Sequence, residues 1–171
     1  MKLFKLGMLL LASATMAAVG LAVASPASAD AHAPIHNGDR TKCLQPVDGS
    51  LDQGAAIVQQ PCNGSAAQQW VFVPLSQTTY QVRNLASQRC LDARGGATNG
   101  TPIQQFTCSG ISNEKWDLGT SFVVLRSLVS GTHSHCIDAP GGQTVDGLAM
   151  QLFACNDTAA QVWTADEFSG T

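Results

Sequence analysis

The stretch CLDARGGATNGTPIQQFTCSGISNEKW, residues 90–116, decides the fold of this chain because it is one of three copies. Each copy opens with a cysteine, holds a second cysteine, and closes with a tryptophan eight residues after the second cysteine. The positions are Cys43, Cys62 and Trp70; Cys90, Cys108 and Trp116; and Cys136, Cys155 and Trp163. A repeat of this length, 46 or 47 residues, indicates a supersecondary unit that buries its apolar face only against its neighbours.

The apolar segments within each copy are short, and turn signals separate them. Trp70-Val71-Phe72-Val73 is typical, with β-branched and aromatic residues in a run of only four. Asn63-Gly64, Asn99-Gly100 and Asp146-Gly147 mark turns, because glycine tolerates positive φ at little cost. After the N-terminal segment, no stretch shows a sustained apolar stripe of helical period. The sequence therefore predicts an all-β fold.

A further strand is expected before each opening cysteine. Residues 80–84 and 122–126 supply it for the second and third copies. The chain ends too soon after Trp163 for another such strand, whereas residues 35–37 precede the first copy at the matching distance. The N-terminal segment is therefore expected to close a ring beside the C-terminus. Three copies of four strands would form a closed barrel with a cap and few exposed edges.

The first 29 residues have the pattern of a secretory signal peptide. Lys2 and Lys5 precede an apolar run over residues 9–23, and Ala27-Ser28-Ala29 is a small-residue cleavage site. A membrane anchor is the alternative, but an apolar run this short with such a site favours removal. The sequence therefore predicts a secreted protein, of bacterial type by its short signal peptide, with no membrane insertion.

Cleavage is expected after Ala29, with Ala33 as the alternative, because the first choice keeps Ile35 well inside the mature chain. The 142 residues that remain suit one domain. We expect this domain to span residues 33–171, with repeats at about 33–78, 79–120 and 121–171.

The charge balance excludes two classes of partner. Without its two N-terminal lysines the chain has 7 basic and 12 acidic residues, a net charge of −5. No basic surface is therefore expected for nucleic acid or for anionic lipid. His133 and His135 lack further ligands for a metal, and we expect no metal and no other cofactor.

Six cysteines in a secreted chain indicate disulfide bonds, and six cysteines allow 15 pairings. Equivalent positions in equivalent units should form equivalent bonds, which selects one set. The expected pairs are Cys43–Cys62, Cys90–Cys108 and Cys136–Cys155. Each disulfide would stabilise the fold by roughly 3 kcal/mol, because the closed loop lowers the entropy of the unfolded chain.

The cysteine pair, the glycine turn and a terminal Gln-x-Trp, three times in phase, resemble the ricin-type (ricin B-like) β-trefoil lectin family. They also resemble the trefoil carbohydrate-binding modules attached to bacterial xylanases and arabinofuranosidases. The resemblance extends over residues 35–165 and departs at Glu114, where the motif has glutamine. It implies a β-trefoil of three pseudo-symmetric repeats, with the three tryptophans in the core rather than stacked on a sugar.

The resemblance also implies a shallow sugar pocket on each repeat. The family uses an aspartate after the first cysteine, an aromatic residue before the second, a polar residue just after the second, and Asn-Gln before the tryptophan. A carboxylate accepts hydrogen bonds from two adjacent hydroxyls, and an amide both donates and accepts. An aromatic face packs against the C–H patch of a pyranose ring.

The three copies match this pocket to different degrees. The second copy has Asp92, Phe106, Ser109, Asn113 and Glu114 at these positions. The third has Asp138, Phe153, Asn156 and Gln161, but Ala160 replaces the asparagine. The first has Gln45, Gln60 and Ala67 in place of the aspartate, the aromatic residue and the asparagine. We therefore expect the second repeat to be the main site, the third a secondary site, and the first no site of this type.

Other interpretations remain open for these residues. Asp92 and Asp138 could serve only turn chemistry, because aspartate bonds its own backbone locally. Phe106 and Phe153 could serve only core packing.

The sequence predicts a carbohydrate-binding, non-catalytic protein that recognises galactose- or xylose-type sugars or polysaccharides that carry them. The alternative is a trefoil that binds no sugar and acts as an interaction subunit or inhibitor of a secreted hydrolase. A hydrolase in its own right is the third interpretation, but nothing places two carboxylates at a catalytic separation.

Overall fold

The structure, a computed structural model, describes residues 32–118, 126–127 and 133–165, and the expected signal peptide lies outside these ranges. The described chain forms twelve strands and five short 3-10 helices. The strands are β1 (His32–Asn37), β2 (Lys42–Pro46), β3 (Ile57–Pro61), β4 (Gln69–Pro74), β5 (Thr79–Asn84), β6 (Cys90–Ala93), β7 (Thr101–Phe106), β8 (Lys115–Asp117), β9 (Arg126–Ser127), β10 (His135–Asp138), β11 (Gln151–Ala154) and β12 (Trp163–Ala165). The 3-10 helices are η1 (Val47–Gly49), η2 (Ala66–Gln68), η3 (Ser112–Glu114), η4 (Pro140–Gly142) and η5 (Ala159–Gln161).

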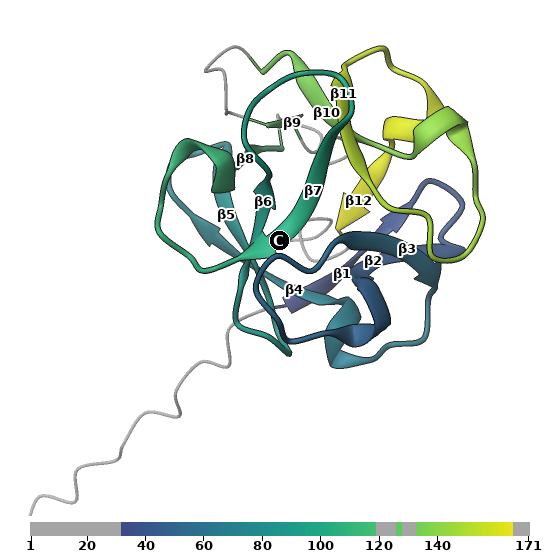
Figure 1. The fold of residues 1–171 in the computed structure, drawn as a ribbon, viewed down its shortest axis with the longest axis horizontal. Helices are drawn as coiled ribbons and strands as arrows, with labels where there is room; N and C mark the ends of the chain where they lie inside the picture. The colour runs from purple at the N-terminus through teal and green to yellow at the C-terminus, as the bar shows by residue number, and fades with distance from the viewer. Residues whose placement is uncertain (1–31, 119–125, 128–132, 166–171) are drawn as a thin grey trace, which may run out of the picture.

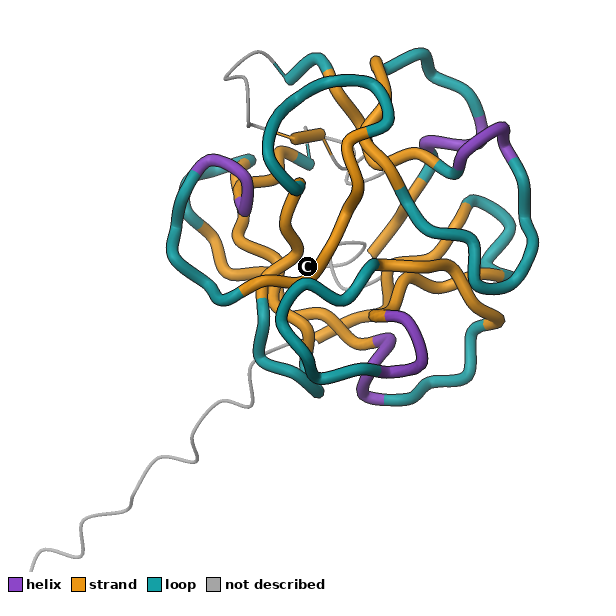
Figure 2. Tube along the Cα trace, viewed as in Figure 1, coloured by secondary structure: helices purple, strands orange, loops and turns teal. Residues whose placement is uncertain are grey.

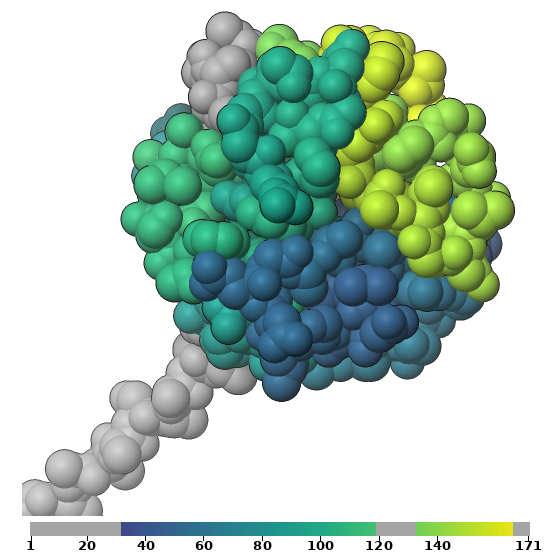
Figure 3. Space-filling model, in the orientation of Figure 1, coloured from purple at the N-terminus to yellow at the C-terminus, as the bar shows by residue number. Residues whose placement is uncertain are grey.

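The strands fall into three groups of four, which Figure 1 shows as three lobes around a common centre. Each group contains one hairpin, β2–β3, β6–β7 or β10–β11, whose first strand also pairs with the strand before it. The remaining strands pair in the order β12–β1–β4–β5–β8–β9. Figure 2 shows that strands and loops make up nearly all of the trace. Figure 3 shows the three lobes packed against one another. This is a β-trefoil, as predicted.

The predicted closure by the N-terminal segment is confirmed. Strand β1 pairs antiparallel with β12, with Ile35 opposite Ala165. The strand predicted over residues 80–84 is β5. Of the strand predicted over residues 122–126, only the last residue is described, as the first residue of β9.

Alternation of side chains explains why these short segments form strands. In β5 the residues Tyr80, Val82 and Asn84 are buried, and the residues between them are only partly buried. A period of two places alternate side chains on opposite faces of a strand, so one face of β5 joins the interior.

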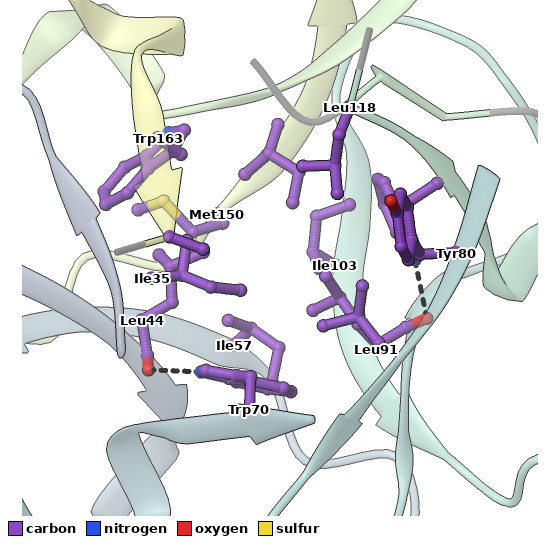
Figure 4. Close-up of a cluster of buried hydrophobic side chains, with 14 of the residues drawn as sticks. Ile35, Leu44, Ile57, Trp70, Tyr80, Leu91, Ile103, Leu118, Met150 and Trp163 are labelled. Atoms are coloured by element: carbon purple, nitrogen blue, oxygen red, sulfur yellow. Dashed lines mark hydrogen bonds between the residues drawn. The ribbon is translucent and has the colours of Figure 1, made fainter. Parts of the chain in front are cut away.

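The three tryptophans lie in the core, as expected. Trp70 and Trp116 have no exposed surface, and Trp163 is 1% exposed. Figure 4 shows the bond from Trp70 Nε1 to the Leu44 carbonyl, 3.0 Å long, and Trp116 Nε1 donates to the Leu91 carbonyl at 2.9 Å. Within the described residues, Trp163 Nε1 has no acceptor.

The three predicted disulfides are present. Cys43 bonds Cys62, Cys90 bonds Cys108, and Cys136 bonds Cys155. Each one ties the first strand of a hairpin to the segment that follows the second strand. Within the described ranges, no helix is long and apolar enough to cross a membrane.

Candidate functional site

The hairpin β6–β7 places three of the second repeat's side chains on one face. Its register sets Asp92 opposite Gln104 and Cys90 opposite Phe106. Because successive side chains point to opposite faces, Asp92, Gln104 and Phe106 share the outer face, while Leu91 enters the core. Gln104 Nε2 donates to Asp92 Oδ1 at 2.7 Å.

The hairpin β10–β11 repeats this arrangement in the third repeat. Asp138 stands opposite Gln151, and Gln151 Nε2 donates to Asp138 Oδ1 at 2.8 Å. Sequence reasoning missed this glutamine and its counterpart Gln104. The signal was present, because each lies two residues before a phenylalanine, in the strand that pairs with the aspartate's strand.

A second glutamine holds the other oxygen of the third-repeat aspartate. Gln161, in η5, is 1% exposed and donates from Nε2 to Asp138 Oδ2 and to the Ala154 carbonyl, both at 3.1 Å. Its Oε1 accepts from the Asn156 backbone N–H at 2.9 Å. Both carboxylate oxygens of Asp138 are therefore fixed by amides. Gln161 lies behind the aspartate, so direct contact between Gln161 and a sugar stays a prediction.

The first repeat has the same supporting glutamine without the aspartate. Gln68 Oε1 accepts from the Asn63 N–H at 2.8 Å, and its Nε2 donates to Gln45 Oε1 and to the Pro61 carbonyl, both at 2.9 Å. The position of the family's aspartate is thus occupied by the buried amide of Gln45. The first repeat thus has the supporting glutamine but lacks the aspartate that this glutamine would hold.

The second repeat differs because Glu114 takes the place of the supporting glutamine. Glu114 has no exposed surface, and its Oε2 accepts from the N–H groups of Ser109 at 2.8 Å and Gly110 at 2.7 Å. Its Oε1 accepts from the Ser109 hydroxyl at 2.9 Å, and Gln81 Nε2 donates to Oε2 at 3.1 Å. An ionised carboxylate has no N–H to give to Asp92. Like Gln161, Glu114 lies behind the expected sugar-facing residues, and its contact with a sugar stays a prediction.

The buried surroundings change the acidity of Asp92, which is 3% exposed. Burial raises the pKa of the Asp92 carboxyl, because a desolvated carboxylate is disfavoured. The hydrogen bond from Gln104 opposes this rise, and the negative charge of Glu114 adds to it. The second repeat therefore has two acids, Asp92 and Glu114, where the third has an acid and an amide.

The third repeat has a hollow of about 460 Å³ at the predicted position. Its lining includes Asp138, Gln151, Phe153, Asn156, Gly142 and Ala160. Three of the predicted site residues are thus brought together, while Gln161 supports them from behind. Asn156 Oδ1 is used locally, since it accepts from the Thr158 N–H at 3.1 Å and from the Thr158 hydroxyl at 2.7 Å.

In the second repeat, the predicted site residues lie on the elements that correspond to those of the third repeat. Phe106 is half-buried on β7, and half-buried Asn113 lies in η3, which contacts β6. Ser109 is exposed just after the disulfide.

A further glutamine, also missed from the sequence, fixes the loop that borders the third hollow. Gln59 projects from the first repeat, is 1% exposed, and donates from Nε2 to the carbonyls of Gln143 at 2.9 Å and Val145 at 3.0 Å. By strand register its counterpart in the second repeat is Gln105. Gln105 holds the first repeat's loop in the same way, through the Ser50 carbonyl at 2.8 Å.

The third member of this set is Leu152, which has no N–H on its side chain to donate. The loop over residues 94–100 of the second repeat therefore does not receive the side-chain bonds that Gln59 gives to the loop of the third. It is held at Asn99 instead, whose Oδ1 accepts from the Ala154 N–H at 2.7 Å.

Comparison with known proteins shows which family part of this chain resembles. A family model described as a ricin-type beta-trefoil lectin domain-like unit matches residues 25–106. A curated relative, Serine protease 1 of Rarobacter faecitabidus, is 33% identical over 78 residues. That match covers 41% of this chain and only 15% of the relative.

Solved structures extend the likeness over all three repeats. A designed 3-fold symmetric protein, ThreeFoil, has a TM-score of 0.71 at 25% identity, covering 78% of this chain and 96% of its own. The exo-beta-1,3-galactanase 1,3Gal43A of Clostridium thermocellum has a TM-score of 0.69 at 28% identity, covering 78% and 29%. A ricin B-like lectin of Macrolepiota procera, solved with lactose, has a TM-score of 0.64 at 20% identity, covering 83% and 99%.

The family match covers the first repeat and most of the second, and the structural likeness adds the third. Together they show that the chain is similar to ricin-type β-trefoil lectin-like domains and has a β-trefoil fold.

Proposed function

We propose that the protein binds carbohydrate, chiefly through the hollow of the third repeat and more weakly through the second repeat. The observation that carries this proposal is the arrangement at Asp138. Its carboxylate is held by the amides of Gln151 and Gln161 at the floor of a hollow that Phe153 also lines. A carboxylate fixed in this way can accept from two sugar hydroxyls without reorganisation, and a phenyl ring beside it offers a face for sugar C–H groups.

The ligand is a galactose- or xylose-type sugar, or a polysaccharide that carries one. The similarity to a galactanase at 28% identity supports galactose, as does the lactose held by the Macrolepiota procera lectin, since lactose contains galactose. The roles divide within each pocket: the aspartate, the phenylalanine and the amide after it face the sugar, and the residue before the tryptophan positions the aspartate.

The second repeat is the weaker site in this proposal, although its sequence matches the family pocket more completely. Asp92, Phe106 and Asn113 provide the same groups, but Glu114 adds a second acid instead of an amide donor. The negative charge of Glu114 disfavours the ionised form of Asp92.

The domain acts outside the cell and by binding rather than by catalysis. Residues 1–29 would direct secretion, and residues 33–171 would form the mature binding domain. In the third hollow the carboxylate of Asp138 is engaged by two amides, an arrangement that suits hydrogen bonding with hydroxyls more than proton transfer.

A glycan array on residues 30–171, followed by isothermal titration calorimetry, tests the proposal. Asp138→Ala should weaken the binding of a galactoside or xyloside at the third site by about 10- to 100-fold, the worth of one or two hydrogen bonds to a charged group. Asp92→Ala should have a smaller effect. Asp52→Ala, an exposed carboxylate in the first repeat, is the control and should change nothing. An array without any bound glycan, or full affinity in the Asp92→Ala, Asp138→Ala double variant, would contradict the proposal.

A further inference from the structure

A second hollow adjoins the one in the third repeat. It has a volume of about 280 Å³ and shares Gly142, Ala159 and Ala160 with the larger hollow. These three residues carry at most a methyl group, so only a low rim stands between the two spaces. Together the hollows reach from Asp138 to the start of the domain.

The far wall of this second hollow is the turn between β1 and β2. Figure 1 shows this turn beside the segment that carries η5. Gly38 lies directly against Val162, because a Cβ atom at Gly38 would be 3.4 Å from Val162 Cγ1. The turn therefore forms a fixed wall, contributed by the first repeat to a site on the third.

Asp39 gives this wall a polar group suited to a sugar. Its side chain is exposed, and its Oδ1 accepts from the Thr41 N–H at 3.1 Å and from the Thr41 hydroxyl at 2.7 Å. These bonds lower the pKa of the Asp39 carboxyl. The carboxylate retains lone pairs for further hydroxyl donors.

The opposite side of the second hollow is also polar. The amide of Gln143 and the hydroxyl of Thr144 line it from the loop after η4, and both residues are exposed. Gln59 lines the same space while its Nε2 fixes that loop through two carbonyls. Carboxylate, amide and hydroxyl groups thus surround a space whose floor includes the apolar side chain of Val162.

We propose that the two hollows form one groove for an oligosaccharide of at least two sugar residues, one bound at Asp138 and the next against Asp39. The inference rests on the proposed function and adds a ligand class to it: a chain of sugars rather than a single residue. The polar groups of the second hollow match the hydroxyls of a second ring, and the low rim leaves room for the linkage.

The replacement at Ala160 fits this groove. The family's asparagine at this position would place an amide on the rim between the two hollows, where Ala160 has only a methyl group. Ala160→Asn should therefore narrow the passage. Because Ala160 also lines the larger hollow, its effect is read from the ratio of two-sugar to one-sugar affinity within the variant.

The test compares chain lengths by isothermal titration calorimetry, with Asp92→Ala as the background so that only the third repeat binds. The probes are galactose with β-1,3-galactobiose, and xylose with xylobiose and xylotriose. The groove predicts that, in one of these series, affinity rises about tenfold from one sugar to two or three, as expected for added hydrogen bonds to a charged group.

Three substitutions test which residues produce the gain in affinity for the longer sugar chain. Asp39→Asn keeps an acceptor for Thr41 but removes the charge, and Ala160→Asn narrows the rim. Asp39→Asn should reduce the gain to about twofold or less while the single sugar binds as before, and Asp52→Asn should retain the full gain. Ala160→Asn should reduce the ratio of oligosaccharide to single-sugar affinity measured in that variant to about twofold or less. Equal affinity for all chain lengths, or a gain that survives in both Asp39→Asn and Ala160→Asn, would overturn the groove and leave the proposed function intact. If no probe of any length binds, both fail.

Discussion

The second and third repeats share one hairpin and one cross-strand bond, yet their aspartates are held differently. Gln104 and Gln151 donate to Asp92 and Asp138 at 2.7 and 2.8 Å. Behind the second aspartate lies an acid, Glu114, whereas the third has an amide donor in the same place. One substitution away from the ligand side therefore changes the charge and the hydrogen bonding around the residue expected to contact the sugar.

The loops that border the two pockets differ as well. Gln59 fixes the loop of the third repeat, while the equivalent residue for the second repeat's loop is Leu152. From this difference we expect the third repeat to be the better site, although its motif is the less complete one. The residues that decide are those that fix the aspartate and the loop, and they lie in a neighbouring strand or in another repeat.

Among changes to the supporting residues, the largest effect is expected when the third repeat's loop loses its support. Gln59→Leu removes two bonds to loop carbonyls, and we expect binding at the third site to weaken about tenfold because the wall is no longer preorganised. Calorimetry in the Asp92→Ala background measures this. Gln105→Leu is the matched control: it removes the equivalent bonds to the first repeat's loop and should leave sugar affinity unchanged. Equal losses in both variants would mean that the effect is one of general stability.

A second comparison concerns the tryptophans. Trp70→Phe removes a buried hydrogen bond and leaves the Leu44 carbonyl without it, whereas Trp163 has no acceptor to lose within the described residues. We expect Trp70→Phe to lower the free energy of unfolding by about 1 kcal/mol more than Trp163→Phe does. Urea unfolding followed by circular dichroism measures the difference. Identical losses would show that the third tryptophan is bonded in solution.

Making the second repeat resemble the third should strengthen it. Glu114→Gln supplies an amide that can donate to Asp92 and removes the competing charge, so we expect about threefold tighter binding at the second site. The measurement is calorimetry in the Asp138→Ala background. The reverse change in the third repeat, Gln161→Glu, should weaken its site. A decrease in affinity on Glu114→Gln would show that the glutamate contacts the sugar itself.

The smallest effect concerns stability and pH. The pKa of Asp92 is raised in the folded protein, so Asp92 contributes stability when protonated, and this contribution is lost as the pH rises through its folded pKa. Asp92→Asn removes the penalty of a buried charge, and we expect it to raise Tm by about 1–3 °C at pH 7. The gain should shrink toward pH 3.8, the ordinary value for aspartate. Asp52→Asn should give no such trend.

The sequence was sufficient to predict the overall fold. The spacing of the cysteines and tryptophans predicted the three repeats and the disulfides, because each copy constrains the other two, and the family resemblance predicted the buried tryptophans. The place of Ile35 relative to Cys43 predicted closure by the N-terminal strand. These features follow from repetition, which a single sequence displays directly.

The candidate site was harder to predict, because its support comes from residues outside the motif. Gln151 acts across a strand pair, and Gln59 acts on a loop 84 residues away in the chain. Sequence comparison of the copies ranked the pockets by the residues expected to touch sugar. It gave no weight to whether Glu114 could donate to Asp92, a question of hydrogen-bond direction that requires the folded geometry.

The central claim is that the third repeat, held by its glutamines, is the main sugar site. The most direct measurement is an NMR titration of ¹⁵N-labelled protein with the best sugar from the array. The account predicts that the amides of Asp138, Phe153 and Asn156 shift at the lowest sugar concentrations, and that those of Asp92 and Phe106 shift only at higher ones. Shifts that begin in the second repeat, while the third remains unchanged, would contradict it.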